Sequence, residues 1–431
     1  MLLIYTHKIT PRFSFVMKQI FERILGLEIQ FTAKVEDFIK HSGAKITYTK
    51  LPLQNEFFIR SNDLLFEQGI NEIEIKISEW EGVPCFFNAG DRSTIPFDIF
   101  SASFYLLSRY EEYVPHVKDT HGRFPPMESL AYKKGFLEKP LVDIWAHKLL
   151  EQLKEKFPDL ESKKNSYNYT SVIDVTSSHC FANRGIVRGL SGLVLDITSL
   201  KLKRVFKRIE VWFNSEKDPY NNFSWLIENH KKFKIKSMFF FQFADYSTFD
   251  KNVSIYNNNF KYLIKSVSDY SIVSLCASYS SFQDISILKK EKKNLSNVIN
   301  RSVSSSRLRY NRVDVPSTYR NLVEAEFTDD YTMGYTHEIG FRASTCTPYY
   351  FYDINLELQQ PVKVHPFAIH DYAFLKLKNN QEIEEKVAKV YNEVKKVNGS
   401  FVTVFSNELF GEKSKISWKK LYQHILKNYN V

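Results

Sequence analysis

The chain has 431 residues, 43% of them hydrophobic and 15% aromatic, which excludes a wholly disordered protein and leaves room for two or three domains. Its 59 basic and 49 acidic residues give a net charge of +10, a modest excess that is typical of a solvated, lysine-rich surface. We therefore predict no nucleic-acid partner.

Cysteine spacing and hydropathy favour a location in the cytoplasm. The four cysteines lie far apart and form no paired motif, so the sequence predicts reduced thiols and a cytoplasmic protein. Residues 1–8 are typical of a strand and not of a signal peptide. No apolar stretch approaches the roughly 20 residues that a membrane helix requires, so we predict no integral membrane segment.

The first part of the chain alternates predicted strands and helices. Proline and apolar stripes indicate the helices, and alternating isoleucines favour one of the strands. The predicted helices are residues 15–25, 96–113 and 141–157, and the predicted strands are residues 46–51 and 73–77. A polar linker at residues 161–166 follows the last helix. We therefore place one domain at residues 1–160 and a second at residues 167–431.

In the second part, short apolar strands alternate with amphipathic helices, a pattern typical of a parallel α/β fold. The predicted strands are residues 169–173, 236–243, 272–275, 362–367 and 401–405. The predicted helices include residues 222–233 and 380–397, and residues 289–301 form a charged helix face that we expect to be solvated.

Polar residues stand at or just beyond the ends of these strands. They are Asp174, Thr176, Asp245, Cys276, Arg342, Asp371, Ser406 and Asn407. In a parallel barrel such strand ends converge on one mouth, so these side chains could share a site. Any one of them taken alone is more typical of a turn or a helix cap.

A metal-assisted hydrolase needs about three His, Asp, Glu or thiolate ligands. The eleven histidines form no His-x3-His pair, and His365 and His370 are five residues apart. A Cys-His-Asp catalytic set built on Cys180 or Cys346 is conceivable, but no local motif supports it.

Several longer motifs carry a resemblance to a known family. They are residues 4–6, 9–12, 98–113, 121–124 and 140–146 in the first part, and residues 217–220, 238–241, 244–246, 316–320, 330–335 and 340–346 in the second. With these the chain resembles the polysaccharide deacetylases of the carbohydrate esterase type, in the two-domain form common in Bacteroidetes. The resemblance implies a distorted β/α barrel, preceded by a smaller α/β or α+β domain, that removes acetyl groups from glycans.

The resemblance also implies site residues. Asp174 matches the acid that acts as general base, and Arg342 matches the arginine that orients it. We expect Asp371 and Tyr349 to contact the substrate. The positions where the family has its second acid, its two metal-binding histidines and its late histidine are altered, and here carry Thr176, Cys276, Arg309 and Ser406.

These replacements predict loss of activity. An arginine cannot ligate a metal, and threonine is a poor substitute for a carboxylate. We expect Arg309 to occupy the metal region and pair with Asp174, or Asp174 to survive as an ion-pair partner of Arg342. The sequence thus predicts a catalytically silent deacetylase-like protein of carbohydrate metabolism with a glycan partner and no cofactor.

Two other functions stay open at this point. One is an active N- or O-acetyl deacetylase with an unusual zinc site. The other is a protein-interaction module in glycan assembly.

Overall fold

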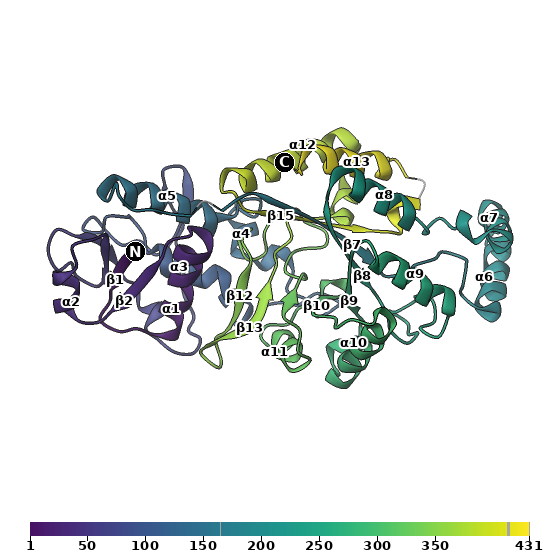
Figure 1. Cartoon of the computed structure of the whole chain (residues 1–431), viewed down its shortest axis with the longest axis horizontal. Helices are drawn as coiled ribbons and strands as arrows, with labels where there is room; N and C mark the ends of the chain where they lie inside the picture. Colours follow the sequence, from purple (N-terminus) through teal and green to yellow (C-terminus); the bar gives the residue numbers. More distant parts are fainter. Residues whose placement is uncertain (164, 412–413, 431) are drawn as a thin grey trace.

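The computed structural model describes residues 1–163, 165–411 and 414–430. The molecule is elongated, with the amino-terminal part at one end and the helices α6 (Ile186–Thr198) and α7 (Leu202–Phe213) at the other (Figure 1). Among the described residues, no helix combines the length and apolarity needed to cross a bilayer.

A four-stranded parallel sheet organises the first part, in the order β2-β1-β3-β4. Its strands are β1 (Leu2–Tyr5), β2 (Ile29–Thr32), β3 (Lys45–Thr49) and β4 (Phe57–Arg60). The helices are α1 (Pro11–Met17), α2 (Val35–Lys40), α3 (Ile99–Leu107), α4 (Leu130–Lys133) and α5 (Leu141–Lys156), and β5 (Ser78–Trp80) pairs with β6 (Val83–Cys85) in a small hairpin.

Two predictions for this part need correction. The first helix begins at Pro11, because Thr10 caps it by accepting the Phe13 N–H, and it continues as a π-helix over Lys18–Ile24. Residues 73–77 form no strand. Their alternating isoleucines pack against the core as an irregular segment that has no partner strand.

The second part is a nine-stranded sheet in the order β12-β13-β11-β10-β9-β8-β7-β15-β14, in which only β12 runs antiparallel to its neighbour. The strands are β7 (Asn168–Val175), β8 (Lys236–Phe241), β9 (Ile272–Ala277), β10 (Ser305–Leu308), β11 (Asp329–Asp330), β12 (Tyr349–Asp353), β13 (Leu358–Val364), β14 (Ile369–His370) and β15 (Ser400–Ser406). The helices after α7 are α8 (Phe223–Phe233), α9 (Asn258–Ser268), α10 (Ile285–Ile299), α11 (Ser317–Glu324), α12 (Asn380–Lys396) and α13 (Trp418–Asn428).

The sheet curves around a small apolar interior of its own. Residues from distant strands form one buried cluster that is separate from the main core, namely Val172, Met238, Phe240, Cys276, Tyr331, Phe367, Val402 and Val404. Alternate residues of β7 and β8, such as Ile173 and Phe239, belong instead to the main core. This inside and outside alternation, with helices around the strands, is a distorted β/α barrel, and the predicted fold class is confirmed.

The two parts of the chain share one continuous core and several buried polar contacts. Asp143 of α5 accepts hydrogen bonds from the Thr345 hydroxyl at 2.7 Å and the Cys346 N–H at 3.0 Å. The Arg12 Nε donates to Glu357 at 2.9 Å. The boundary between residues 1–160 and 167–431 stays a prediction, and buried apolar and polar contacts cross it.

Glu291 of α10 is a buried carboxyl without a basic partner in its described surroundings, where it accepts the Ser278 N–H at 3.1 Å. Burial raises the pKa of Glu291 to about 8. Because the usual value is 4.5, stability should fall as the pH rises from about 4.5 to about 8, over the range in which only the unfolded chain is ionised.

We therefore expect Glu291→Gln to raise the free energy of unfolding by about 2–4 kcal/mol at pH 8 and by little at pH 5. Urea unfolding at the two pH values measures this difference. The exposed Glu324, paired with Lys289, offers a control, since Glu324→Gln should change stability by under about 0.5 kcal/mol at either pH. An equal gain from Glu291→Gln at both pH values would contradict the assignment.

Candidate functional site

The carboxyl-terminal ends of the barrel strands surround a cavity of about 360 Å³, which we call the mouth cavity. Its lining residues are His121, Arg123, Asp174, Thr176, Cys276, Leu308, Arg309, Tyr310, Asn311, Thr336, His337, His370, Tyr372 and Ser406. Five predicted positions thus meet in one place, since Asp174 and all four altered positions belong to this set. His121 and Arg123 add a wall from the first part of the chain.

Asp174 is held by a buried arginine. Arg307 of β10 donates from Nε to Asp174 Oδ1 at 2.7 Å and from Nη2 to Oδ2 at 2.9 Å, a two-pronged ion pair. The same guanidinium donates to Asn311 Oδ1 at 2.9 Å and to the Tyr331 carbonyl oxygen. Both oxygens of Asp174 are therefore engaged by one fixed cation.

This pairing corrects two expectations. Arg309 does line the mouth cavity, but Arg307, two residues earlier in the chain, forms the pair with Asp174. Arg307 lies in β10 and contacts Asp174, whereas Arg309 begins the short helical turn Arg309–Asn311 after the strand and lines the cavity. Arg307 is almost fully buried, whereas Arg309 lies beyond the end of β10 and is partly exposed.

Arg342 is not at the mouth. Its guanidinium makes a two-pronged ion pair with Glu112, at 2.9 Å from Nε and 2.6 Å from Nη2, and Arg109 Nε donates to the same carboxylate at 2.7 Å. Arg342 and Arg109 are both 1% exposed. Burial raises the pKa of Glu112, but the two arginines outweigh burial and hold that pKa below its usual value. Arg342 therefore joins the two parts of the chain and does not orient Asp174.

The two predicted substrate contacts are also placed elsewhere. Tyr349 of β12 is fully buried in the main core and outside the mouth cavity, so its ring cannot stack on a sugar. Asp371 is fully buried behind the cavity wall, where its Oδ2 accepts the Ser406 N–H at 2.5 Å. Its role is to fix the end of β15.

Asp371 also lies beside His370, a cavity residue. His370 Nδ1 is 2.8 Å from Asp371 Oδ1, and His370 Nε2 is 3.8 Å from Asp174 Oδ2. An imidazole between two carboxylates can hold or pass a proton. The prediction named Asp371 because it follows a strand, but the adjacent His370 is the residue that reaches the cavity.

The remaining altered positions carry weak metal donors. Thr176 donates its hydroxyl to Glu408 at 2.5 Å. Cys276 is buried, and burial together with the nearby charge of Asp174 raises the pKa of its thiol far above the ordinary value, so the thiol stays protonated. Neither side chain presents an anionic donor to the cavity.

The far wall of the mouth cavity is cationic and aromatic. The Arg309 guanidinium carbon lies 4.4 Å from the centroid of the Tyr310 ring, and its buried Nε has no hydrogen-bond partner among the described residues. The Tyr310 ring stacks on His121 at 4.7 Å, with an interplanar angle of 19°. Burial and the charge of Arg123 lower the pKa of both His121 and His337, so these imidazoles are neutral at pH 7.

A divalent metal, which the resemblance implies, does not fit these residues. Among the described residues, no group of three or more His, Cys, Asp or Glu side chains is arranged to hold a metal ion. Asp174, the one carboxylate in the described lining of the mouth cavity, is paired with Arg307, and a metal beside it would meet the guanidinium charge. Cys276 is protonated and Thr176 is neutral, so neither completes a zinc ligand set.

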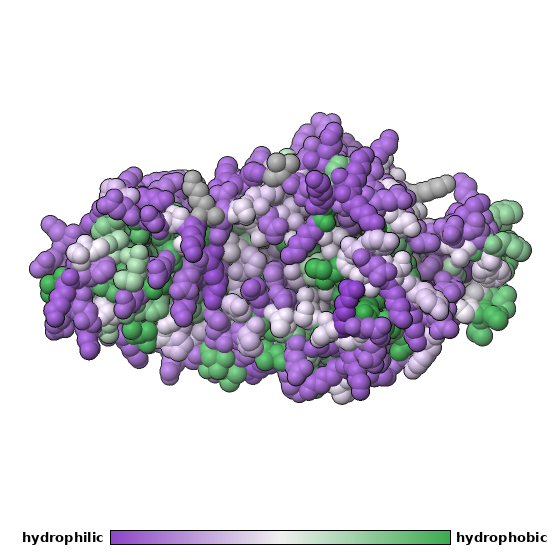
Figure 2. Space-filling model, viewed as in Figure 1, coloured by the Kyte–Doolittle hydropathy of each residue, from purple (hydrophilic) through white to green (hydrophobic). Residues whose placement is uncertain are grey.

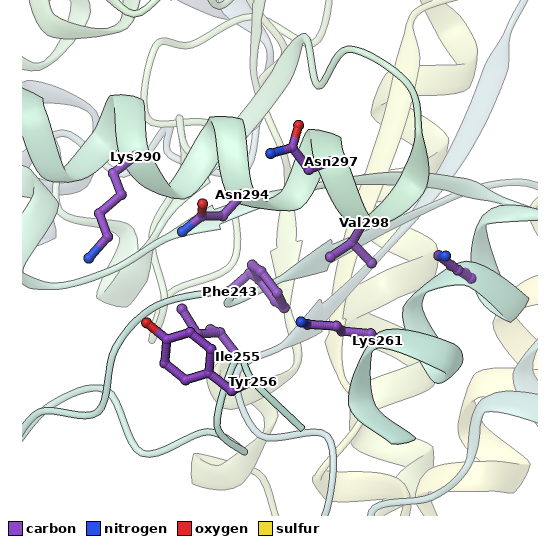
Figure 3. Close-up of a pocket in the computed structure, with 9 residues that line it drawn as sticks. Phe243, Ile255, Tyr256, Lys261, Lys290, Asn294, Asn297 and Val298 are labelled. Carbon is purple, nitrogen blue, oxygen red and sulfur yellow. The ribbon is translucent and has the colours of Figure 1, made fainter. Parts of the chain in front are cut away.

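A second hollow of about 420 Å³ lies between α9 and α10 (Figure 3). It is lined by Phe243, Ile255, Tyr256, Lys261, Lys265, Lys290, Asn294, Asn297 and Val298. Its described lining holds no carboxylate, histidine or thiol, and Lys290 pairs with Asp245 at 2.9 Å. The ionisable groups described in this hollow are lysines and one tyrosine, and no acidic partner lies among them to form a catalytic pair.

Comparison with known proteins gives a family match for the first part only. Residues 2–158 match a family of unknown function, DUF7033. No curated protein matches the chain.

Solved structures similar to the chain include polysaccharide deacetylases. A putative polysaccharide deacetylase from Mycobacterium smegmatis is 11% identical, covering 63% of this chain and 88% of its own, with a TM-score of 0.39. A mutant CE4 family pseudoenzyme with restored enzymatic activity is 9% identical, covering 62% and 64%, with a TM-score of 0.29. The Puue allantoinase is 12% identical, covering 74% and 94%, with a TM-score of 0.39. What this chain does must therefore be inferred from its own cavity.

Proposed function

We propose that this polysaccharide deacetylase-like protein binds an acidic saccharide in the mouth cavity and does not catalyse metal-dependent deacetylation. The observation that carries the proposal is the two-pronged pairing of Arg307 with both oxygens of Asp174. The glycan setting, in surface glycan or exopolysaccharide metabolism, and the cytoplasmic location are part of the same proposal.

The pairing removes what a general base requires. A general base must reach the attacking water with a free oxygen and a pKa matched to the working pH. Both oxygens of Asp174 accept hydrogen bonds from the buried Arg307 guanidinium, so neither is free to take a proton from an attacking water. Among the residues that the structure describes, the surrounding side chains supply no metal site that would activate the water in its place.

The character of the cavity wall supports an acidic saccharide as the ligand. Tyr310 and His121 present stacked rings, a surface on which the apolar face of a sugar ring can lie. Arg309 adds a cation whose Nε has no described partner, and a carboxylate or sulfate group would satisfy it. Aromatic stacking beside a fixed cation favours a charged sugar over a neutral one.

The test measures acetate release and binding in parallel. We expect no acetate release from acetylated oligosaccharides, and calorimetric binding of an acidic oligosaccharide such as oligogalacturonate. Arg309→Ala should weaken that binding about tenfold, because one charge-assisted hydrogen bond is lost. Lys290→Ala, in the hollow between α9 and α10, is the control and should bind as the wild type does.

Either of two results would overturn the proposal. One is acetate release that Asp174→Asn abolishes. The other is oligogalacturonate binding that is absent, or is unchanged in Arg309→Ala.

A second candidate, hydrolysis without a metal, is favoured by one observation. His370 lies between Asp371 and Asp174 at 2.8 and 3.8 Å and faces the mouth cavity. Such an imidazole could act as general base. Acetate release that resists chelators and is lost in His370→Ala would select this candidate.

A further inference from the structure

The helical hairpin α6–α7 exposes an unusual amount of apolar surface. Of the 29 large hydrophobic residues that are exposed in the described part of the chain, twelve lie within residues 186–213. Phe206 and Phe213 are 72% and 89% exposed. The hairpin forms one end of the molecule, and Figure 2 shows hydrophobic residues gathered on that end. A concentration of this size marks a surface that contacts another phase or molecule.

The two helices pack antiparallel through small residues. Trp212 of α7 approaches Gly189 of α6, and Arg208 approaches Gly192 so closely that a Cβ there would lie 2.8 Å from the guanidinium. Arg208 also pairs with Asp196 at 2.7 Å. The two helices are therefore packed against each other by the Arg208–Asp196 ion pair and by Trp212 on Gly189, and most of the apolar side chains of the hairpin lie outside this contact.

Eight of the twelve exposed apolar residues form one stripe on each helix. On α6 the stripe is Ile186, Leu190, Val194 and Ile197, and on α7 it is Leu202, Phe206, Ile209 and Phe213. At about 100° per residue, each stripe lies roughly a quarter to a third of a turn from the seam. Because the helices are antiparallel and both stripes are turned in the same sense from the helix–helix contact, the two stripes lie on the same side of the hairpin. The hairpin thus presents one broad apolar face.

The charge of the hairpin is strongly basic. Residues 184–213 contain seven basic and two acidic residues. Both acids are already paired, Asp196 with Arg204 and Arg208, and Glu210 with Lys207 and Lys217. Lys201 and Lys203, at the tip, have no ion pair among the described residues and are exposed. The apolar face therefore lies beside a net positive charge.

We propose that the α6–α7 hairpin lies in the surface of a bilayer that contains anionic lipids. Helices of 13 and 12 residues are about 20 Å long, too short to cross a hydrocarbon core of about 30 Å but suited to lying in its surface. The apolar face would enter the acyl region, and the basic residues would contact the headgroups. The position of the hairpin at one end of the molecule leaves this approach open.

A second copy of the chain fits the same face less well. A two-fold dimer through the hairpin would bring its basic residues against their own counterparts, and opposed like charges are costly. Anionic headgroups remove that repulsion. The membrane proposal does not depend on what the mouth cavity binds.

The test is co-sedimentation of the full chain with vesicles. We expect binding to phosphatidylcholine vesicles that contain phosphatidylglycerol, and at least about tenfold weaker binding to phosphatidylcholine alone. Phe206→Glu with Phe213→Glu should weaken binding by more than about tenfold, because the two rings that would enter the acyl region of the bilayer are lost. Lys201→Glu with Lys203→Glu should weaken binding only to the anionic vesicles.

Two controls keep the result interpretable. Tyr262→Glu changes an exposed aromatic residue on α9, which is 67% exposed, and should bind as the wild type does. Trp212 is the exposed tryptophan among the described residues, so brominated lipids should quench its fluorescence, and Trp212→Phe should remove that quenching. The melting temperatures of the phenylalanine, lysine and tyrosine variants should match that of the wild type, since the changed side chains are exposed.

Absence of vesicle binding would overturn the proposal, as would unchanged binding by the double phenylalanine variant. Equal binding to neutral and anionic vesicles would overturn its electrostatic part. Self-association in the ultracentrifuge, abolished by the same variant and without vesicle binding, would assign the face to a second copy of the chain.

Discussion

Replacing Glu112 with alanine should lower the free energy of unfolding by about 3–5 kcal/mol, the largest effect that we expect from a single substitution. Glu112 is the shared partner of Arg109 and Arg342, and all three side chains are at most 2% exposed. Removal of the carboxylate leaves Arg342 without the only ion pair described for it, in a place that water does not reach. Urea or thermal unfolding measures the loss.

An exposed ion pair that joins the same two parts of the chain provides the control. Lys389 pairs with Glu138 at 2.6 Å, with side chains 67% and 34% exposed. Glu138→Ala should cost under about 1 kcal/mol, because solvent screens the pair. An equal loss of unfolding free energy in Glu112→Ala and Glu138→Ala would contradict the claim that the buried ion pairs of Glu112 hold the amino-terminal part to the barrel.

Replacing Arg307 with methionine should lower the free energy of unfolding by about 3 kcal/mol, because Asp174 then loses both hydrogen bonds from its permanently charged partner while it stays a nearly buried carboxylate. Methionine keeps much of the volume but supplies no donor. Arg309→Met provides the matched control. Its guanidinium pairs with no described carboxylate, so the loss should stay under about 1 kcal/mol.

A double-mutant cycle separates the pair from the effects of packing. Asp174→Asn in the Arg307→Met background should recover much of the lost stability, since the buried charge is gone. We expect a coupling energy of about 2–3 kcal/mol between the two positions. A coupling energy near zero would mean that the ion pair between Asp174 and Arg307 contributes nothing to stability.

Much of the fold could be predicted because its strands and helices are long and strongly patterned. The apolar run that ends at Asp174 became β7, and the periodic stripe after Pro140 became α5, Leu141–Lys156. The prediction of a strand at residues 73–77 was wrong, because alternating isoleucines form a strand only where a neighbouring strand is available for pairing. β10, Ser305–Leu308, was not predicted because three of its four residues are polar.

The site was predicted in location but not in its pairings. Parallel strands bring their ends to one mouth, so the convergence of Asp174 with the four altered positions followed from topology. The choice between Arg307 and Arg309 depends on where β10 ends, to within two residues. Arg342 contacts Glu112 across 230 positions of sequence, and no local pattern marks that contact.

The central claim is that Asp174 pairs with Arg307 and does not coordinate a metal ion. Measurement of the zinc content tests this claim most directly. The full chain would be incubated with zinc, passed through gel filtration and analysed by mass spectrometry for metals. We expect no stoichiometric zinc in the wild type and no difference between the wild type and Asp174→Asn. About one zinc ion per chain, lost in Asp174→Asn, would contradict the account.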